Sequence, residues 1–121
     1  MPRTSFAAVA PQSGAQLGVV AAGDHDIVMT AGDVANGNEV PWTSNRLLLH
    51  AWNDSAGALT MTITAVADST SGRLTTITTY SLAGDDHAYA LFDRDGWQQT
   101  DGTLYIDSSG AAVKYVCLAI Q

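Results

Sequence analysis

The sequence predicts an all-β protein, a single β-sandwich or jelly-roll-like domain of about seven or eight antiparallel strands preceded by an extended N-terminal arm. Apolar runs of strand length follow one another, separated by turn-forming residues about every eight to twelve positions. Thr is abundant, whereas Lys and Glu occur once each, a balance that favours strands over helices. No segment carries a convincing helical period.

The totals indicate one domain and exclude two classes of partner. A chain of 121 residues can bury one core, and we expect an arm at residues 1–16 and the sandwich at residues 17–121. The formal charge of −7 does not suit a phosphate backbone, so no nucleic-acid partner is expected. No stretch approaches the roughly 20 apolar residues that span a bilayer, so no membrane partner is expected. Cys117 lies in an apolar pattern and should be buried.

The first 16 residues contain two prolines and one glycine, a composition that neither propagates a helix nor pairs as a long strand. They are therefore predicted to be extended. Pro2 and Pro11 also interrupt any hydrophobic core of a signal peptide. We expect the protein to be made in the cytoplasm and to be used there or assembled there into something larger.

The strongest strand signal is the run RLLLHAWN at residues 46–53. It is apolar on both alternating faces, with Leu47, Leu49 and Ala51 on one and Leu48, His50 and Trp52 on the other. Such a strand is central in its sheet or carries a partner surface. A turn signal at residues 53–57 leads into the alternating run at 59–66, so these two strands are predicted to form a hairpin.

The other strands are shorter. They are predicted at residues 17–21, 27–30, 74–82, 87–92, 103–107 and 112–120, with an extended segment at 37–42. Pro41 in that extended segment belongs at a strand edge or entry. The last two runs flank Ser108-Ser109-Gly110 and are predicted to close the chain as a hairpin.

Two clusters of acidic residues invite a metal-binding interpretation. Asp24-His25-Asp26 places three possible ligands in a row, but adjacent residues on a turn rarely converge on one ion. Asp93-Arg94-Asp95-Gly96 resembles the opening of a calcium loop, yet Trp97 stands where the third oxygen ligand is needed. Turns are the better interpretation of both clusters, and no metal or cofactor is expected.

Catalytic patterns are weak. His50 could act as a base with Asp54 in a small hydrolase, but no nucleophile stands in a recognisable setting. Asp85-Asp86 and the Asp93/Asp95 pair lie in turn-rich loops, whereas a glycosidase needs two carboxyls held across a cleft. We therefore expect a protein that is not an enzyme.

Three tryptophans offer a binding hypothesis. Trp52 is expected in the core, and Trp42 and Trp97 are expected to close loops. Exposed aromatic rings can also stack on sugars or anchor an interface. A carbohydrate-binding or adhesin-like module that uses Trp42, Trp97 and Tyr89 is therefore the alternative function.

The order of features resembles that of a known family. The features are Gly37-Asn38-Glu39-Val40-Pro41, Arg46-Leu47-Leu48-Leu49, the turn at residues 53–57, Leu59-Thr60-Met61-Thr62-Ile63, Leu82-Ala83-Gly84, residues 99–106 and the apolar end at 116–120. This arrangement resembles the small head decoration or cement proteins, a kind of minor capsid protein, of tailed phages. The resemblance covers about residues 32–120.

The resemblance implies a virion structural protein that binds the outer surface of a phage head and bridges major capsid subunits. It implies a homo-oligomer, with a trimer favoured, located on the capsid surface after assembly in the host cytoplasm. On this hypothesis the arm reaches a neighbouring subunit. The candidate interface residues are Arg3, Phe6, Val9, Trp42, Trp97 and Tyr115.

Overall fold

Nine strands and no helix occur in the part of the chain that the computed structural model describes, residues 2–9, 28–72 and 74–120. The all-β prediction is confirmed. The strands are β1 (Thr4–Ser5), β2 (Thr30–Ala31), β3 (Asn38–Pro41), β4 (Arg46–Asn53), β5 (Leu59–Thr64), β6 (Ile77–Leu82), β7 (His87–Asp93), β8 (Thr103–Ser108) and β9 (Val113–Ile120). Within the same residues, no helix is long and apolar enough to cross a membrane.

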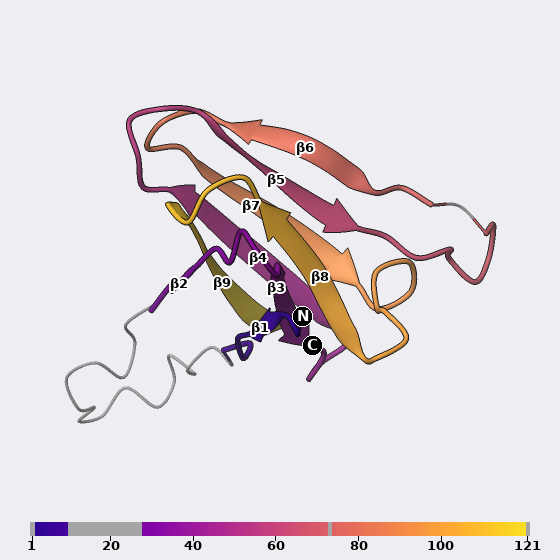
Figure 1. Ribbon diagram of the computed structural model, residues 1–121. Coiled ribbons are helices and arrows are strands. Elements are labelled where there is room, and N and C mark those ends of the chain that lie inside the picture. The colour runs from indigo at the N-terminus through magenta and orange to yellow at the C-terminus, as the bar shows by residue number, and fades with distance from the viewer. Residues whose placement is uncertain (1, 10–27, 73, 121) are drawn as a thin grey trace, which may run out of the picture.

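The strands form two sheets that lie against each other in a sandwich-like arrangement (Figure 1). One sheet has the order β1-β3-β8-β5-β6 and the other has the order β2-β9-β4-β7. β1 runs parallel to β3, and every other neighbouring pair is antiparallel. From β2 onward the chain crosses to the opposite sheet at each connection except the one between β5 and β6.

A shared core lies between the sheets because alternate side chains of each strand point inward. The central strand β4 shows this most clearly, since Leu47 and Ala51 are fully buried and Leu49 is 1% exposed. From the other sheet, β8 contributes Leu104 and Ile106, both fully buried. The prediction that residues 46–53 form a central strand is confirmed, with β7 on one side and β9 on the other.

Two predicted hairpins are wrong. β4 does not pair with β5, and β8 does not pair with β9, because each of these connections carries the chain into the opposite sheet. The side chain of Asn53 stabilises the connection that carries the chain from β4 to β5 in the opposite sheet. It is fully buried, and its Nδ2 donates to the carbonyls of Gly57 at 2.8 Å and Leu82 at 2.9 Å. The bond to Leu82 ties the end of β4 to β6 in the opposite sheet.

A second buried asparagine stabilises the connection between β2 and β3, which also lie in different sheets. Asn38 is fully buried, and its Oδ1 accepts a 2.8 Å hydrogen bond from the amide of Asp33. Both asparagines stand at inward positions at one end of a strand, where an apolar residue would remove these hydrogen bonds. The two crossings are therefore specified by side chains and not only by turn composition.

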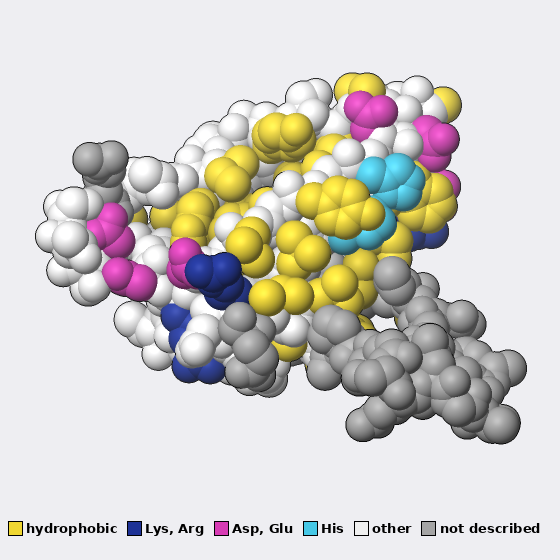
Figure 2. Space-filling model, turned by 180° about the vertical axis from the view of Figure 1, so that it is seen from behind, with side chains coloured by type: hydrophobic (Ala, Val, Ile, Leu, Met, Phe, Trp, Pro, Cys, Tyr) yellow, Lys and Arg dark blue, Asp and Glu magenta, His cyan; other side chains and the backbone are white. Residues whose placement is uncertain are grey.

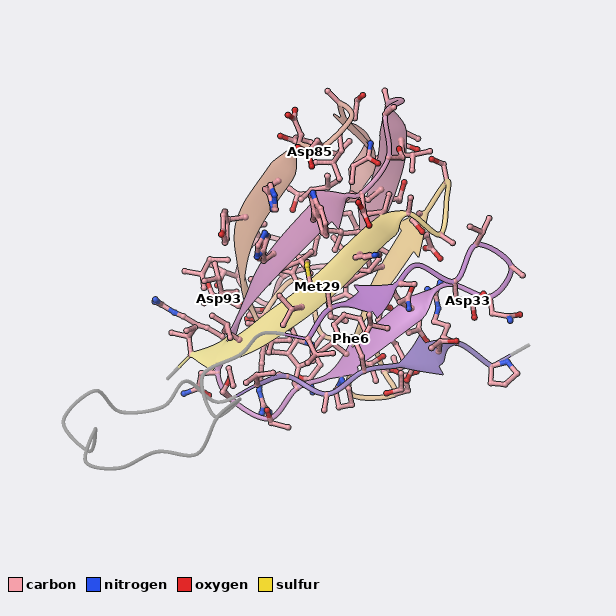
Figure 3. The ribbon with its side chains drawn as sticks, turned by 90° about the vertical axis from the view of Figure 1, so that its left-hand side faces the viewer. Phe6, Met29, Asp33, Asp85 and Asp93 are labelled. Atoms are coloured by element: carbon pink, nitrogen blue, oxygen red, sulfur yellow. The ribbon has the colours of Figure 1, made fainter. Side chains whose placement is uncertain are left out.

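The N-terminal segment 2–9 lies along its own domain and connects the two sheets. Thr4 and Ser5 pair with β3, and Val9 exchanges backbone hydrogen bonds with Cys117 and Ala119 of β9 at 2.8 and 2.9 Å. Between these contacts Phe6 is buried, with its ring stacked 6.2 Å from that of Tyr115 (Figure 3). The predicted boundary after residue 16 thus does not separate residues 2–9 from the body.

Other predictions differ in detail. The strand predicted at 74–82 begins at Ile77, and the run predicted at 27–30 contributes only Thr30 to a two-residue strand with Ala31. Pro41 is the last residue of β3, as its missing amide hydrogen requires. Residues 10–16 of the predicted arm, the predicted strand at 17–21 and the Asp24-His25-Asp26 cluster lie outside the described residues.

Candidate functional site

The outward side of the β2-β9-β4-β7 sheet carries the candidate site. The strand registers align the outward positions of β4, β7 and β9 in rungs. We call this surface the aromatic face, and define it by Leu48, His50, Trp52, His87, Tyr89, Leu91, Lys114, Val116 and Leu118. Figure 2 shows it from the front, with hydrophobic side chains around the two described histidines.

Four aromatic rings follow one another across the aromatic face. The centroids of Tyr89 and His50 are 4.4 Å apart, those of His50 and His87 are 5.0 Å apart, and those of His87 and Trp52 are 5.4 Å apart. Trp52 and His87 are nearly parallel, with 4° between their planes. Lys114 Nζ lies 5.5 Å from the centre of the Trp52 ring. The row is continuous because each ring occupies an outward position on β4 or β7.

The rest of the aromatic face is mainly aliphatic, and exposure varies across it, from 3% for Val116 to 52% for Leu91. Leu48, Leu91 and Leu118 form one rung, and Val9 lies beside Leu118 through an isolated bridge. Tyr89 is 66% exposed, Leu91 is 52% exposed and Val9 is 44% exposed. Large exposed apolar side chains that form a contiguous patch indicate a binding surface more often than isolated ones do.

Polar pairs lie at the two ends of the aromatic face. At one end Trp52 Nε1 donates to Asp85 Oδ1 at 3.0 Å, and Lys114 Nζ lies 2.8 Å from Asp54 Oδ2. At the other end Arg46 Nε lies 3.1 Å from Asp93 Oδ1. Figure 3 labels Asp85 and Asp93 at these opposite ends. An apolar centre with a polar rim is the usual composition of a protein interface.

The two histidines form a hydrogen-bonded pair in the middle of the row. His50 Nε2 and His87 Nδ1 are 2.8 Å apart, so one nitrogen donates and the other accepts. Partial burial lowers the pKa of His50, and the charge of His87 lowers it further. Both effects favour the neutral form of His50.

The residues of the hydrolase hypothesis have separate partners. His50 pairs with His87, whereas Asp54 pairs with Lys114. The two aspartates of the suggested calcium loop also have different partners, since Asp93 pairs with Arg46 and Asp95 accepts from Ser69. Among the described residues, no group of three or more His, Cys, Asp or Glu side chains could hold a metal ion.

Three of the six predicted interface residues lie inside the domain. Phe6 is 9% exposed, Trp42 is 8% exposed and Tyr115 is fully buried, so these three side chains belong to the core. Each occupies an inward position that the strand alternation or the docked N-terminal segment gives it. A partner cannot reach them without opening the domain.

The remaining three candidates are closer to the surface. Trp97 is partly buried, with its ring packed at 66° against that of Phe92, 4.6 Å between centroids. Arg3 is held by Asp107 at 3.0 Å and lies 4.0 Å from the centre of the Tyr105 ring. Only Val9 lies at the border of the aromatic face.

The sequence interpretation missed most of the aromatic face. Leu91 and Leu118 were not singled out, and Tyr89 was named only for sugar binding. The signal is present in β7, where two of the three inward positions hold the small residues Ala88 and Ala90 while Tyr89 and Leu91 point outward. A strand with its large apolar residues on the outward side indicates a surface that contacts something else.

The chain was compared with family models, curated proteins and solved structures, and none of them matches it. The functional argument therefore rests on the geometry and chemistry of the aromatic face.

Proposed function

We propose that the chain is a virion structural protein without enzymatic activity, a decoration or cement protein that binds the outer surface of a tailed-phage head and bridges major capsid subunits. The aromatic face is the surface that docks. The observation that carries the proposal is this exposed apolar surface of one sheet, with Tyr89 66% and Leu91 52% exposed and ion pairs at both ends. Such a surface suits a protein partner.

The strand order supports the proposal at the level of the fold. Leaving β1 aside, β2-β9-β4-β7 and β3-β8-β5-β6 are two four-stranded sheets. We interpret this order as the double Greek key of a jelly roll, a fold that viral capsid proteins and lectins both use. A fold of this kind is compatible with both candidate functions, so the surface has to decide between them.

The aliphatic rung favours a protein partner over a sugar. Leu48, Leu91 and Leu118 offer apolar area but no hydrogen-bonding group, and a sugar ring carries hydroxyls that need partners. A capsid surface can cover aliphatic and aromatic side chains together. Each copy needs to contribute only about a few kcal/mol of binding, because many copies act on one shell.

Carbohydrate binding is the second candidate, and one observation favours it. The exposed ring of Tyr89 continues through the histidines to Trp52, whose indole already bonds the carboxylate of Asp85. A ring platform beside an acceptor resembles what a sugar requires. Trp42, one of the residues first suggested for this role, is buried in the core.

The test begins with the particle. Mass spectrometry of purified virions should find the protein, and the purified chain should sediment with heads from which it has been removed. A glycan array probed with the wild type and with Tyr89→Ala tests the alternative, carbohydrate binding. Absence from virions, together with glycan binding that Tyr89→Ala abolishes, would replace the proposed function with the sugar-binding one.

A further inference from the structure

The strand β7 is the longest and most regular sheet edge among the described residues. Four strands lie at sheet edges in the described residues, and two of them, β1 and β2, are only two residues long. β6 is longer, but its register against β5 shifts between Met61 and Ile63, and Thr79 has a φ of 47°. β7 pairs all seven of its residues with β4 without a shift.

Natural proteins usually protect such an edge. Their devices are short strands, bulges, prolines, lysines and charges that point inward. β7 has none of these, since its inward positions hold Ala88, Ala90 and Phe92. Among the described residues, no strand pairs with the outer edge of β7, so its outer backbone groups can bind another strand along its length.

The core behind β7 is also incompletely covered. Ala88 and Ala90 point inward, yet both stay partly exposed, whereas the inward residues of β4 are at most 1% exposed. Beside them on the outward side, Tyr89 and Leu91 are more than half exposed. Among the residues that the structure describes, nothing covers this side of the sheet in the way that β4 covers the other side.

We propose that β7 pairs antiparallel with β7 of a second copy, about a two-fold axis that passes beside Ala90. Only this register pairs all seven residues of both strands. It sets Tyr89 opposite Leu91 of the second copy, and Ala88 opposite Phe92, so outward and inward side chains keep their faces. Ala90 faces its own counterpart on the axis.

The ends of the strand complement each other in this register. His87 at the start of β7 comes opposite Asp93 at the end of β7 in the second copy. Asp93 uses Oδ1 for Arg46 at 3.1 Å, which leaves acceptor capacity for the imidazole N–H of His87. Aromatic–aliphatic pairs and hydrogen-bonded pairs across strands both stabilise a sheet. In this register β7 is complementary to itself, so a second copy of the chain is the partner that it fits.

The pairing joins two β2-β9-β4-β7 sheets into one continuous sheet and brings two aromatic faces side by side. The contact is isologous, so it links copies two by two. It does not depend on attachment to a virion, because every group that forms it belongs to this chain. If the protein does decorate a head, the dimer presents a doubled docking surface.

The first measurement is the mass of the full-length protein by sedimentation equilibrium over a range of concentrations. The proposal predicts a reversible dimer of twice the 12.6 kDa chain mass. A monomer at every concentration would leave β7 as an edge for a strand of another protein, and it would overturn the proposal. A trimer would overturn it as well.

Cysteine cross-linking then tests the register. Opposite residues in antiparallel strands have Cα atoms about 4.5–5.5 Å apart, within the range of a disulfide. Ala90→Cys should therefore form a covalent dimer under mild oxidation, and Ala88→Cys, whose counterpart lies four residues further along, should not. The native Cys117 is buried, and burial raises its pKa to about 12, so the wild type serves as the uncross-linked control. Equal cross-linking of both variants would contradict the register.

Discussion

The outward faces of the two sheets differ in what they offer to the surroundings. On the β1-β3-β8-β5-β6 sheet, the outward positions of β5 are Thr60, Thr62 and Thr64. On the β2-β9-β4-β7 sheet, the equivalent positions carry Leu, His, Trp and Tyr side chains. Both faces belong to the same small domain, and folding requires only the inward faces to be apolar.

We call the outward side of the β1-β3-β8-β5-β6 sheet, with Thr60, Thr62 and Thr64, the polar face. Its polar groups form hydrogen bonds within the chain. Thr62 Oγ1 accepts from the amide of Thr79 at 3.0 Å, and Ser109 Oγ accepts from the amide of Thr60 at 2.8 Å. The one large aromatic residue of β8 there, Tyr105, donates its hydroxyl to Asp101 and lies under Arg3. The aromatic face instead leaves Tyr89 and Leu91 more than half exposed. The side chains of one face thus bond within the chain, and the exposed apolar side chains of the other are the basis of the proposed docking surface.

The largest expected effect comes from the core that both faces share. Phe6→Ala removes a buried ring that packs on Tyr115, and should lower the free energy of unfolding by about 3 kcal/mol. Denaturant unfolding of the full chain measures this change. Val9→Ala is the control, because Val9 is 44% exposed and should cost far less. Equal effects of the two substitutions would mean that residues 2–9 are not part of the body.

The next effect tests the crossing that places β4 and β5 in different sheets. Asn53→Ala removes the amide donor shared by the carbonyls of Gly57, Leu82 and Ala83, which should cost about 2 kcal/mol of stability. Thermal unfolding measures the loss. Ser55→Ala in the same turn removes one exposed hydroxyl and should cost less than half as much. If Asn53→Ala were neutral, the side chain would not determine the crossing.

A matched pair of tyrosines sharpens the comparison between the faces. Tyr105→Ala should lower the melting temperature, since Tyr105 is held by Asp101 and Arg3 of its own chain. Tyr89→Ala should change it little, because Tyr89 is 66% exposed and stacks only on His50. Its effect should appear in association with a partner. A larger loss of thermal stability for Tyr89→Ala than for Tyr105→Ala would contradict the division of roles.

The smallest effect is a difference in the response to pH. The pKa of His50 is lowered from its ordinary 6.5, so the unfolded state binds more protons, and stability should fall as the pH drops below about 6.5. On the polar face, hydrogen bonds from Thr103 and Tyr105 lower the pKa of Asp101 from 3.8. The stability that ionised Asp101 contributes to the fold is therefore lost only as the pH falls below about 3.8. NMR titration of the histidines and unfolding at several pH values check this. His50→Gln should flatten the slope between pH 6.5 and 5.

The local alternation of apolar and polar residues predicted most of the strands, but it did not predict which strands pair with each other. The run at 46–53 matches β4 in both bounds, because alternation and the turn that follows are local signals. The two predicted hairpins were wrong because a short polar turn can either reverse the chain in one sheet or carry it to the other. That choice depends on Asn53 bonding to Leu82, a contact between residues far apart in the sequence.

The candidate site was predictable only in part. Alternation placed Leu48, His50 and Trp52 together on one face of β4. The expectation that Trp52 belongs to the core is wrong, because its side chain is only partly buried and lies on the outward side with Asp85 and His87. The extension of this face over Leu91 and Leu118 depends on registers that the sequence does not reveal. Trp42 and Tyr115 look suited to an interface by residue type, but their inward positions place them in the core.

One measurement tests the account most directly, the sedimentation of two charge variants with purified phage heads. Tyr89→Asp places a carboxylate in the aromatic face, and Thr60→Asp places the same group on the polar face. After thermal unfolding has shown that both variants fold, Thr60→Asp should bind like the wild type, and Tyr89→Asp should bind at least about tenfold more weakly. Equal binding by the two variants, or loss of binding only in Thr60→Asp, would contradict the claim that the aromatic face is the docking surface.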